Sequence, residues 1–90
     1  MTIDEPEYTI AVGSAARRQQ TDVLPEAVAA AAWELITGDV KKYPRRVGKP
    51  LQGQFEGTWS ARRGTYRIRY RIVDKAIQIL DIDHRRDAYH

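Results

Sequence analysis

Residues 58–73, TWSARRGTYRIRYRIV, constrain the fold more than any other part of the sequence. In the second half of this stretch, apolar or aromatic residues alternate with arginines. The first set is Tyr66, Ile68, Tyr70 and Ile72, and the second is Arg67, Arg69 and Arg71. Because successive side chains on a pleated strand point to opposite faces, the pattern predicts a strand with one apolar and one arginine face. The apolar face needs a core, and the arginine face needs solvent or an anion.

The neighbouring segments predict that this strand belongs to an antiparallel meander of three strands. Turn residues at Arg63-Gly64 and Asp74-Lys75 separate runs that are rich in β-branched and aromatic residues. The expected strands are residues 58–62, 65–73 and 76–83.

The last of these strands is expected to be central in the sheet. Ile77 and Ile79 fall on one of its faces, and Leu80 and Ile82 fall on the other, so we expect both faces to be at least partly covered. Residues 43–50, YPRRVGKP, are expected to form a basic loop bounded by two prolines.

The first half of the chain predicts one strand followed by two helices. Residues 8–12 alternate like a short strand, residues 15–24 predict a weak helix, and the alanine-rich residues 25–37 predict the best helix in the chain. Apolar residues spaced by three and four give this helix a stripe that can cover a sheet. The stripe is Leu24, Val28, Ala31, Ala32, Leu35 and Ile36. Trp33 is expected to pack on the first helix, and Gly38 to end or weaken the second.

This order of elements predicts an α+β fold of the type β-α-α-β-β-β. A helical hairpin would cover one face of a single sheet of about four strands, with the first strand beside the last. Residues 1–90 are expected to form one domain, in which residues 1–7 are a flexible arm. The arginine face of the sheet would then be left without a covering layer, which suits a polyanion.

Charge is distributed unevenly along the chain. Residues 1–40 carry two basic and seven acidic side chains, whereas residues 41–90 carry thirteen basic and five acidic ones. Eleven of the fifteen basic residues are arginine, whose planar fork binds phosphate oxygens in pairs and stacks on bases. An arginine-rich basic half is a common footprint of nucleic-acid contact. The alternative is a solvated surface that keeps a small protein in solution.

The composition also excludes several classes of site. The sequence has no cysteine, which excludes a disulfide framework, a thiolate zinc site and a cysteine nucleophile. No apolar run approaches the roughly 20 residues that a membrane span needs. The acidic segment MTIDEPEYTI lacks the basic region typical of a secretory signal. These features fit a cytoplasmic protein without a membrane contact.

Three stretches carry motifs that are specific when they are taken together. They are residues 48–72, GKPLQGQFEGTWSARRGTYRIRYRI, the tail DHRRDAY at residues 83–89, and the helical hairpin before them. In these stretches the chain resembles the RelE/ParE superfamily of bacterial toxins, and the RelE-like ribosome-dependent mRNA endonucleases in particular. The resemblance implies the toxin of a type II toxin–antitoxin system. Such a toxin would cut mRNA in the ribosomal A site without a metal, by attack of the ribose 2′-hydroxyl on the adjacent phosphate.

The resemblance also assigns roles to individual residues. Arg67 matches the family's phosphate-stabilising arginine, and Arg62 matches a basic residue on the neighbouring strand. Arg85 matches a basic residue suited to the leaving-group side. Tyr89 matches the C-terminal tyrosine that stacks on a splayed mRNA base and helps to orient the hydroxyl.

Further basic residues are expected to contact RNA. They are Arg45, Arg46 and Lys49, which would meet ribosomal RNA, and Arg69 on the sheet.

The sequence leaves another interpretation of the sheet arginines open. Arg67 could pair with Asp81 or Asp83 across the sheet, and Arg69 could pair with Asp81.

The chain departs from the family pattern at two points. Ser60 stands where the best-known members have a second lysine, which removes one cation. The loop of residues 48–51 lacks the glutamate that is a candidate base in a related branch. The general base is therefore open among His84, His90 and Tyr89, with imidazole the side chain best suited to proton transfer at neutral pH.

A toxin of this type would have defined partners. The expected ones are a RelB-like antitoxin, the 70S ribosome and mRNA, with no direct DNA binding by this chain. The antitoxin would be partly disordered when free and would wrap the basic cleft.

Two alternative functions remain open. One alternative is a ParE-like toxin that inhibits DNA gyrase without nuclease chemistry. The other is an RNA-binding module that has lost its activity together with the cation at position 60.

Overall fold

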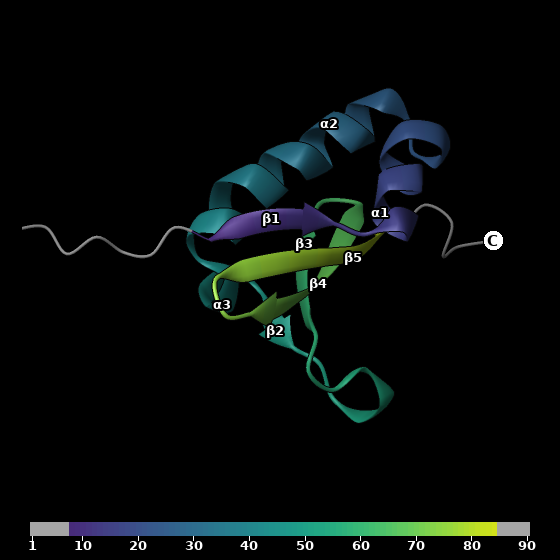
Figure 1. Cartoon of the computed structure of the whole chain (residues 1–90). Coiled ribbons are helices and arrows are strands. Elements are labelled where there is room, and N and C mark those ends of the chain that lie inside the picture. The colour runs from purple at the N-terminus through teal and green to yellow at the C-terminus, as the bar shows by residue number, and fades with distance from the viewer. Residues whose placement is uncertain (1–7, 85–90) are drawn as a thin grey trace, which may run out of the picture.

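The computed structural model describes residues 8–84, in which helices pack on one face of a mixed sheet (Figure 1). The strands are β1 (Thr9–Val12), β2 (Lys49–Pro50), β3 (Trp59–Arg63), β4 (Tyr66–Val73) and β5 (Ala76–His84). The α-helices are α1 (Ser14–Arg18), α2 (Glu26–Leu35) and α3 (Pro44–Val47). Wider π-helical turns, Gln19–Val23 and Ile36–Val40, continue α1 and α2, and Gly53–Phe55 forms a 3₁₀ turn. The predicted α+β class is confirmed, and the expected arm, residues 1–7, lies outside the described residues.

The sheet has the strand order β1-β5-β4-β3-β2. β1 runs parallel to β5, and the other neighbours are antiparallel, which confirms the expected meander and the place of the first strand. Two short elements within residues 43–50 differ from the prediction. The sheet has five strands instead of about four, and the segment predicted to be a loop contains a helical turn and a short strand. Pro44 begins the helical turn α3, where its fixed φ and missing N–H are tolerated. Lys49 and Pro50 add a fifth strand at the sheet edge, where proline needs no ladder partner on its outer side.

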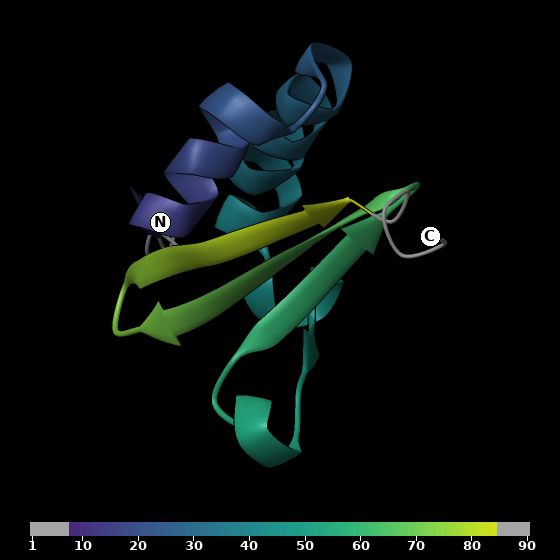
Figure 2. The ribbon, with the colours of Figure 1, turned by 90° about the vertical axis from the view of Figure 1, so that its right-hand side faces the viewer.

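The core lies between the helical layer and one face of the sheet (Figure 2). Its buried members are Ala16, Ala32, Leu35, Ile36 and Val40 from the helices, and Ala61, Tyr66, Ile68, Tyr70, Ile77, Ile79 and Ile82 from the sheet. The predicted apolar stripe of the second helix therefore faces the core. Trp33 is 41% exposed and does not belong to the core, and its packing on the first helix stays a prediction. Of the two predictions for Gly38, the end of the helix is wrong and a local irregularity is confirmed, since a π turn carries the helix through Val40.

A β-bulge in β5 changes which residues of that strand face the core. Arg69 of β4 is opposite Asp81, but Tyr70 is opposite Ile79, so Leu80 is an extra residue on β5. The side-chain alternation shifts by one at this point. The predicted placement of Ile82 on the face opposite Ile79 is therefore wrong, and both side chains are buried in the same core.

The part of β5 beyond the bulge extends past the end of β1, and a glutamine takes the place of a neighbouring strand there. The amide N–H of Ile82 donates a hydrogen bond of 2.7 Å to Gln19 Oε1. Gln19 is the first residue of the π turn that continues α1. The first helix thereby provides a hydrogen-bond acceptor for the Ile82 N–H, which lies beyond the end of β1.

Tyr70 joins β4 to α3 from inside the core. Its side chain is fully buried, and its hydroxyl donates a hydrogen bond of 2.6 Å to the carbonyl oxygen of Pro44. Burial raises the pKa of Tyr70 from its ordinary value of about 10 to about 12. The folded protein therefore holds this proton more tightly than the unfolded chain does.

We expect the stability of the protein to fall between pH 10 and pH 12 in a way that depends on Tyr70. In this range the unfolded tyrosine has lost its proton and the folded one has not, so the free energy of unfolding decreases as pH rises, by roughly 2–3 kcal/mol. Urea unfolding of the wild type and of Tyr70→Phe across this range measures the effect. The phenylalanine variant should be less stable at neutral pH, by about 1 kcal/mol for the lost hydrogen bond, and should lose less stability in alkali. Identical pH dependence of the two proteins would contradict this assignment.

Candidate functional site

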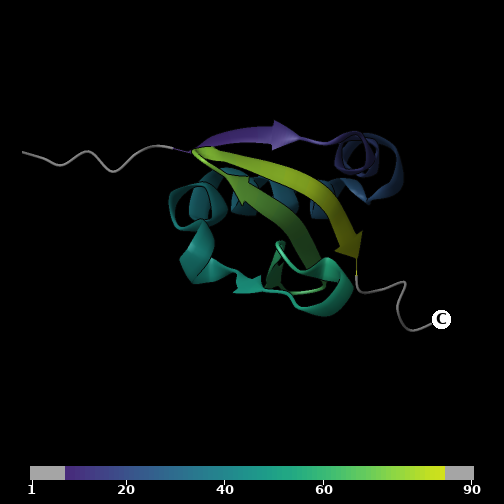
Figure 3. The ribbon, with the colours of Figure 1, turned by 60° about the horizontal axis from the view of Figure 1, so that its bottom comes forward.

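The sheet face away from the helices carries two rows of polar residues that cross the strands. The first row is Lys49, Ser60, Arg69 and Asp81, and the second row is Arg62, Arg67 and Asp83. Residues directly opposite one another on neighbouring strands present their side chains to the same face. We call this surface, together with Arg71, the arginine face. Figure 3 is turned toward this side of the sheet, with helices behind the strands.

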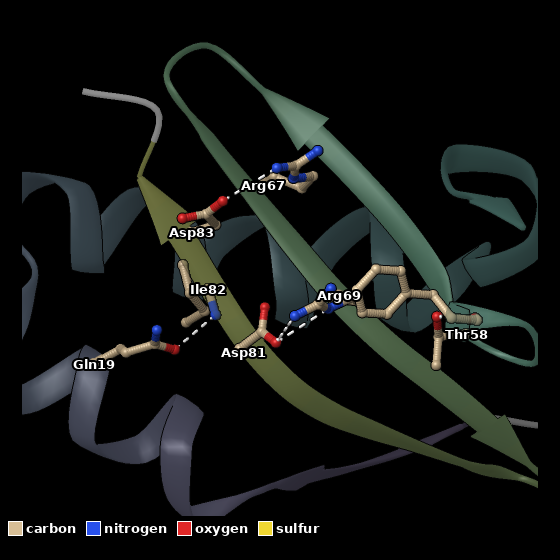
Figure 4. Close-up of polar contacts among 8 residues, drawn as sticks. Gln19, Thr58, Arg67, Arg69, Asp81, Ile82 and Asp83 are labelled. Atoms are coloured by element: carbon tan, nitrogen blue, oxygen red, sulfur yellow. Dashed lines mark hydrogen bonds and ion pairs between the residues drawn. The ribbon is translucent and has the colours of Figure 1, made fainter. Parts of the chain in front are cut away.

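The second row places two arginines beside one carboxylate. Arg67 Nη2 donates a hydrogen bond of 3.1 Å to Asp83 Oδ2, so the interpretation of Arg67 as an ion-paired residue is confirmed (Figure 4). Arg62 stands directly opposite Arg67 on β3 and is exposed. Like charges at directly opposite positions are destabilising, and Asp83 can offset only one of the two. A bound anion would neutralise the remaining positive charge.

The first row has a different chemistry, because its arginine is already neutralised. Arg69 Nε donates a hydrogen bond of 3.0 Å to Asp81 Oδ2, and Arg69 Nη2 contacts the same oxygen (Figure 4). Both side chains are about two-thirds buried or more. The expected pairing of Arg69 with Asp81 is confirmed. Arg69 is therefore held in place rather than available as a mobile cation.

An aromatic residue that the sequence analysis missed completes the first row. The guanidinium carbon of Arg69 lies 4.6 Å from the centroid of the Phe55 ring. Phe55 belongs to the loop of residues 51–57, which projects on the side of the sheet away from the helices (Figure 2). The sequence signal was a single aromatic residue between glycines in the polar stretch QGQFEG.

The other predicted RNA contacts are spread over the molecule. Lys49 is exposed on the edge strand β2 and belongs to the first row. Arg45 and Arg46 lie on α3, where Arg45 Nη1 donates a hydrogen bond of 2.8 Å to the Tyr8 hydroxyl. Tyr8 adjoins the beginning of β5, whereas Arg67 is opposite its end. The structure therefore does not bring the arginines of α3 together with Arg67.

His84 is the last residue of β5, next to the residue that is opposite Arg67, but its side chain is on the other face of the sheet. It is opposite Tyr66, whose side chain faces the core, and it follows Asp83, which faces the arginines. Its Nε2 atom lies 3.1 Å from the Thr65 hydroxyl oxygen. Arg85, Tyr89 and His90 lie outside the described residues. Across residues 8–84, no three histidine, aspartate or glutamate side chains gather where they could hold a metal ion.

Comparison with known proteins assigns the chain to a family. A family model described as the ParE toxin of the type II toxin–antitoxin system parDE matches residues 4–89. This chain belongs to the RelE/ParE superfamily of type II toxins. None of the helices between residues 8 and 84 of this toxin is long and apolar enough to span a membrane.

Two curated relatives and one solved structure narrow the comparison. Toxin RelG of Mycobacterium tuberculosis is 48% identical over 84 residues, which cover 91% of this toxin and 95% of the relative. Toxin RelE of the same bacterium is 41% identical over 91 residues, which cover 99% and 92%. The crystal structure of the toxin–antitoxin complex RelBE2 from M. tuberculosis contains a chain that is 47% identical, with a TM-score of 0.82 over 88% of this toxin and 99% of that chain.

Proposed function

We propose that this toxin is an endoribonuclease that cleaves mRNA in the A site of the ribosome, and that the scissile phosphate binds between Arg62 and Arg67. The observation that carries the proposal is the direct opposition of these two arginines on the sheet face that the helices of residues 8–84 leave uncovered. A like-charged pair of this kind costs stability unless an anion lies between its members. The relatives named RelE and RelG support RelE-like chemistry.

The proposed reaction is an attack by the 2′-oxygen of the ribose on the adjacent phosphorus. The P–O5′ bond breaks as the new bond forms, and the products are a 2′,3′-cyclic phosphate and a 5′-hydroxyl. Negative charge builds up on the non-bridging phosphate oxygens in the transition state. The guanidinium groups of Arg62 and Arg67 would donate hydrogen bonds to these oxygens and supply the positive charge, so the scheme needs no metal ion.

Two proton transfers complete the proposed chemistry. The proposed base for the 2′-hydroxyl is one of His84, His90 and Tyr89. His84 ends β5 on the face opposite Arg67, so to act it must leave its contact with Thr65 and turn toward the arginine face. Arg85 is proposed, from the resemblance to the family, to stabilise the negative charge on the leaving 5′-oxygen, which takes its proton from the protonated base or from water. Tyr89 is proposed, from the same resemblance, to stack on the displaced base. Arg45, Arg46 and Lys49 are proposed to contact ribosomal RNA, as exposed cations outside the phosphate site.

The proposed partners are a RelB-like antitoxin, the 70S ribosome and mRNA. The similar chain of the RelBE2 complex was solved with an antitoxin, which supports the first of these. An acidic antitoxin segment that covers the arginine face would block the phosphate site by charge alone.

Toeprinting on translating ribosomes tests the proposed activity. We expect the purified toxin to cut mRNA within the A-site codon and to leave a 2′,3′-cyclic phosphate. Free mRNA should be cut far more slowly than mRNA on the ribosome. Intact mRNA in this assay would contradict the proposal.

A ParE-like activity against DNA gyrase is the second candidate, because the matching family model is that of the ParE toxin. Cells that stop growing with intact mRNA and with gyrase-dependent DNA damage would favour this alternative. The two outcomes differ in the nucleic acid that is damaged, so one induction experiment with both readouts separates them.

A further inference from the structure

Phe55 is an exposed aromatic residue in a position that core packing does not explain. The residue is 40% exposed, and its ring lies against a charged guanidinium group on the sheet face that the helices leave uncovered. The apolar core described above is on the other face of the sheet. Within residues 8–84, the contact that the structure gives this ring is with the guanidinium of Arg69.

The loop that carries Phe55 is built to hold the ring in place. Gly53 and Gly57 flank it with φ values of 69° and 93°, a region that other residues rarely adopt. The carbonyl oxygen of Phe55 accepts hydrogen bonds from the Thr58 hydroxyl at 2.6 Å and from the Thr58 N–H at 3.1 Å. Thr58 itself is buried. The ring therefore sits on a tightly turned, hydrogen-bonded loop rather than on a free one.

The group beneath the ring is fixed as well. Asp81 holds the guanidinium of Arg69 through Nε and Nη2, so the guanidinium carbon that lies 4.6 Å from the Phe55 ring centroid is a fixed support for the ring. With its charge already paired, Arg69 is a poor ligand for a phosphate but a good stacking partner. The ring is thus a stacked, pre-oriented surface, with about two-fifths of the residue exposed.

We propose that Phe55, supported by Arg69 and Asp81, is a stacking platform for a base of the RNA substrate next to the scissile phosphate. Aromatic rings beside a cationic backbone groove are how proteins bind single-stranded RNA. Arg69 follows Arg67 by two residues on β4, about 6.8 Å along the strand, so the platform adjoins the proposed phosphate site. This inference rests on the proposed function, and it assigns a residue for which the resemblance gives no role.

Three replacements of Phe55 separate stacking from simple space filling. Cleavage rates on programmed ribosomes are measured at subsaturating toxin for Phe55→Ala, Phe55→Leu and Phe55→Trp. We expect losses of roughly 5- to 150-fold for alanine and leucine, and near wild-type rates for tryptophan, because only an aromatic ring offers a stacking face. Trp33→Ala is the matched control, since Trp33 has similar exposure but lies on α2 in the helical layer. Full activity of Phe55→Leu would overturn the platform.

A binding measurement keeps this test independent of cleavage. The tryptophan fluorescence of the Phe55→Trp variant is followed as ribosomes are added that carry, in the A site, mRNA with a 2′-deoxy scissile nucleotide. The signal of the wild type under the same conditions is subtracted. Such RNA lacks the attacking hydroxyl, and we expect the added fluorescence to be quenched by stacking. Unchanged fluorescence overturns the platform whether or not the wild type cleaves RNA. If quenching occurs but the wild type cleaves nothing, the platform stands and only the proposed activity fails.

The same variants test whether the ring serves the antitoxin instead. In that case Phe55→Ala would bind and cleave RNA like the wild type but would be inhibited more weakly by the antitoxin. That result would also overturn the assignment of the ring to RNA.

Discussion

Replacement of Arg67 by alanine is expected to lower the rate of mRNA cleavage on programmed ribosomes by roughly 10²–10³-fold or more. Arg67 is on the uncovered sheet face, opposite Arg62, with its guanidinium directed by Asp83. Its charge would contact the phosphate most strongly in the transition state, so its loss should lower the maximal rate more than the affinity for ribosomes. Single-turnover cleavage at saturating toxin measures this effect. Arg67→Lys should recover only part of the rate, because lysine lacks the planar fork.

Arg71→Ala is the matched control for this prediction. Arg71 is on the same strand and the same face, is exposed, and lies opposite Gln78 instead of a second arginine. Its removal takes away the same unit of charge, and we expect only a few-fold decrease that fades as ionic strength rises. Equal losses in the two variants would mean that Arg67 acts through general attraction of RNA, and the proposed role in the reaction would be wrong.

Replacement of Gly48 by alanine is expected to destabilise the fold by roughly 2–4 kcal/mol. A Cβ atom at this position would lie 2.0 Å from Tyr70 Oη and 3.2 Å from the carbonyl oxygen of Pro44. Tyr70 is fully buried and cannot swing away, so the added methyl group must break its hydrogen bond to Pro44 or displace α3. The free energy of unfolding from urea titration measures the cost. Gly48 is therefore required in this loop for close packing.

Gly38→Ala is the control for that substitution, with the opposite expected sign. A Cβ built on Gly38, which is in a helical turn, meets no atom within 4 Å beyond its chain neighbours and the backbone of its own helix. Alanine should stabilise the helix there by about 0.5–1 kcal/mol. A loss of stability at position 38, or none at position 48, would show that the packing around Tyr70 and α3 differs from the structure described above.

The sequence predicted the parts of the fold that depend on side-chain periodicity. The alternation in residues 66–72 identified β4 and its two faces, and the spacing of apolar residues identified the face of α2 that packs on the core. The arginine face followed from the same alternation. These predictions hold because a buried face is specified repeatedly along an element, residue after residue.

The errors arose where a single residue or a distant contact decided the local structure. The bulge at Leu80 reverses the alternation with one extra residue, so a strict period of two misplaced Ile82. Residues 49 and 50 form a strand only because β3 is beside them, which a local pattern cannot reveal. The role of Phe55 was not predicted, because the fold of the loop places Phe55 against Arg69, which is distant in the sequence.

The parallel pairing of β1 with β5 bears on when the toxin becomes active. These strands are the first and last of the described chain, and they are neighbours in the sheet. During synthesis the N-terminal segments emerge first, so β1 has no neighbour until residues 76–84 leave the ribosome. Until then Arg67 and Arg69 also lack Asp83 and Asp81, which order them. A toxin proposed to attack ribosomes would thus remain unassembled while most of its own chain is being translated, and an antitoxin made at the same time could meet it as the last strand closes the sheet.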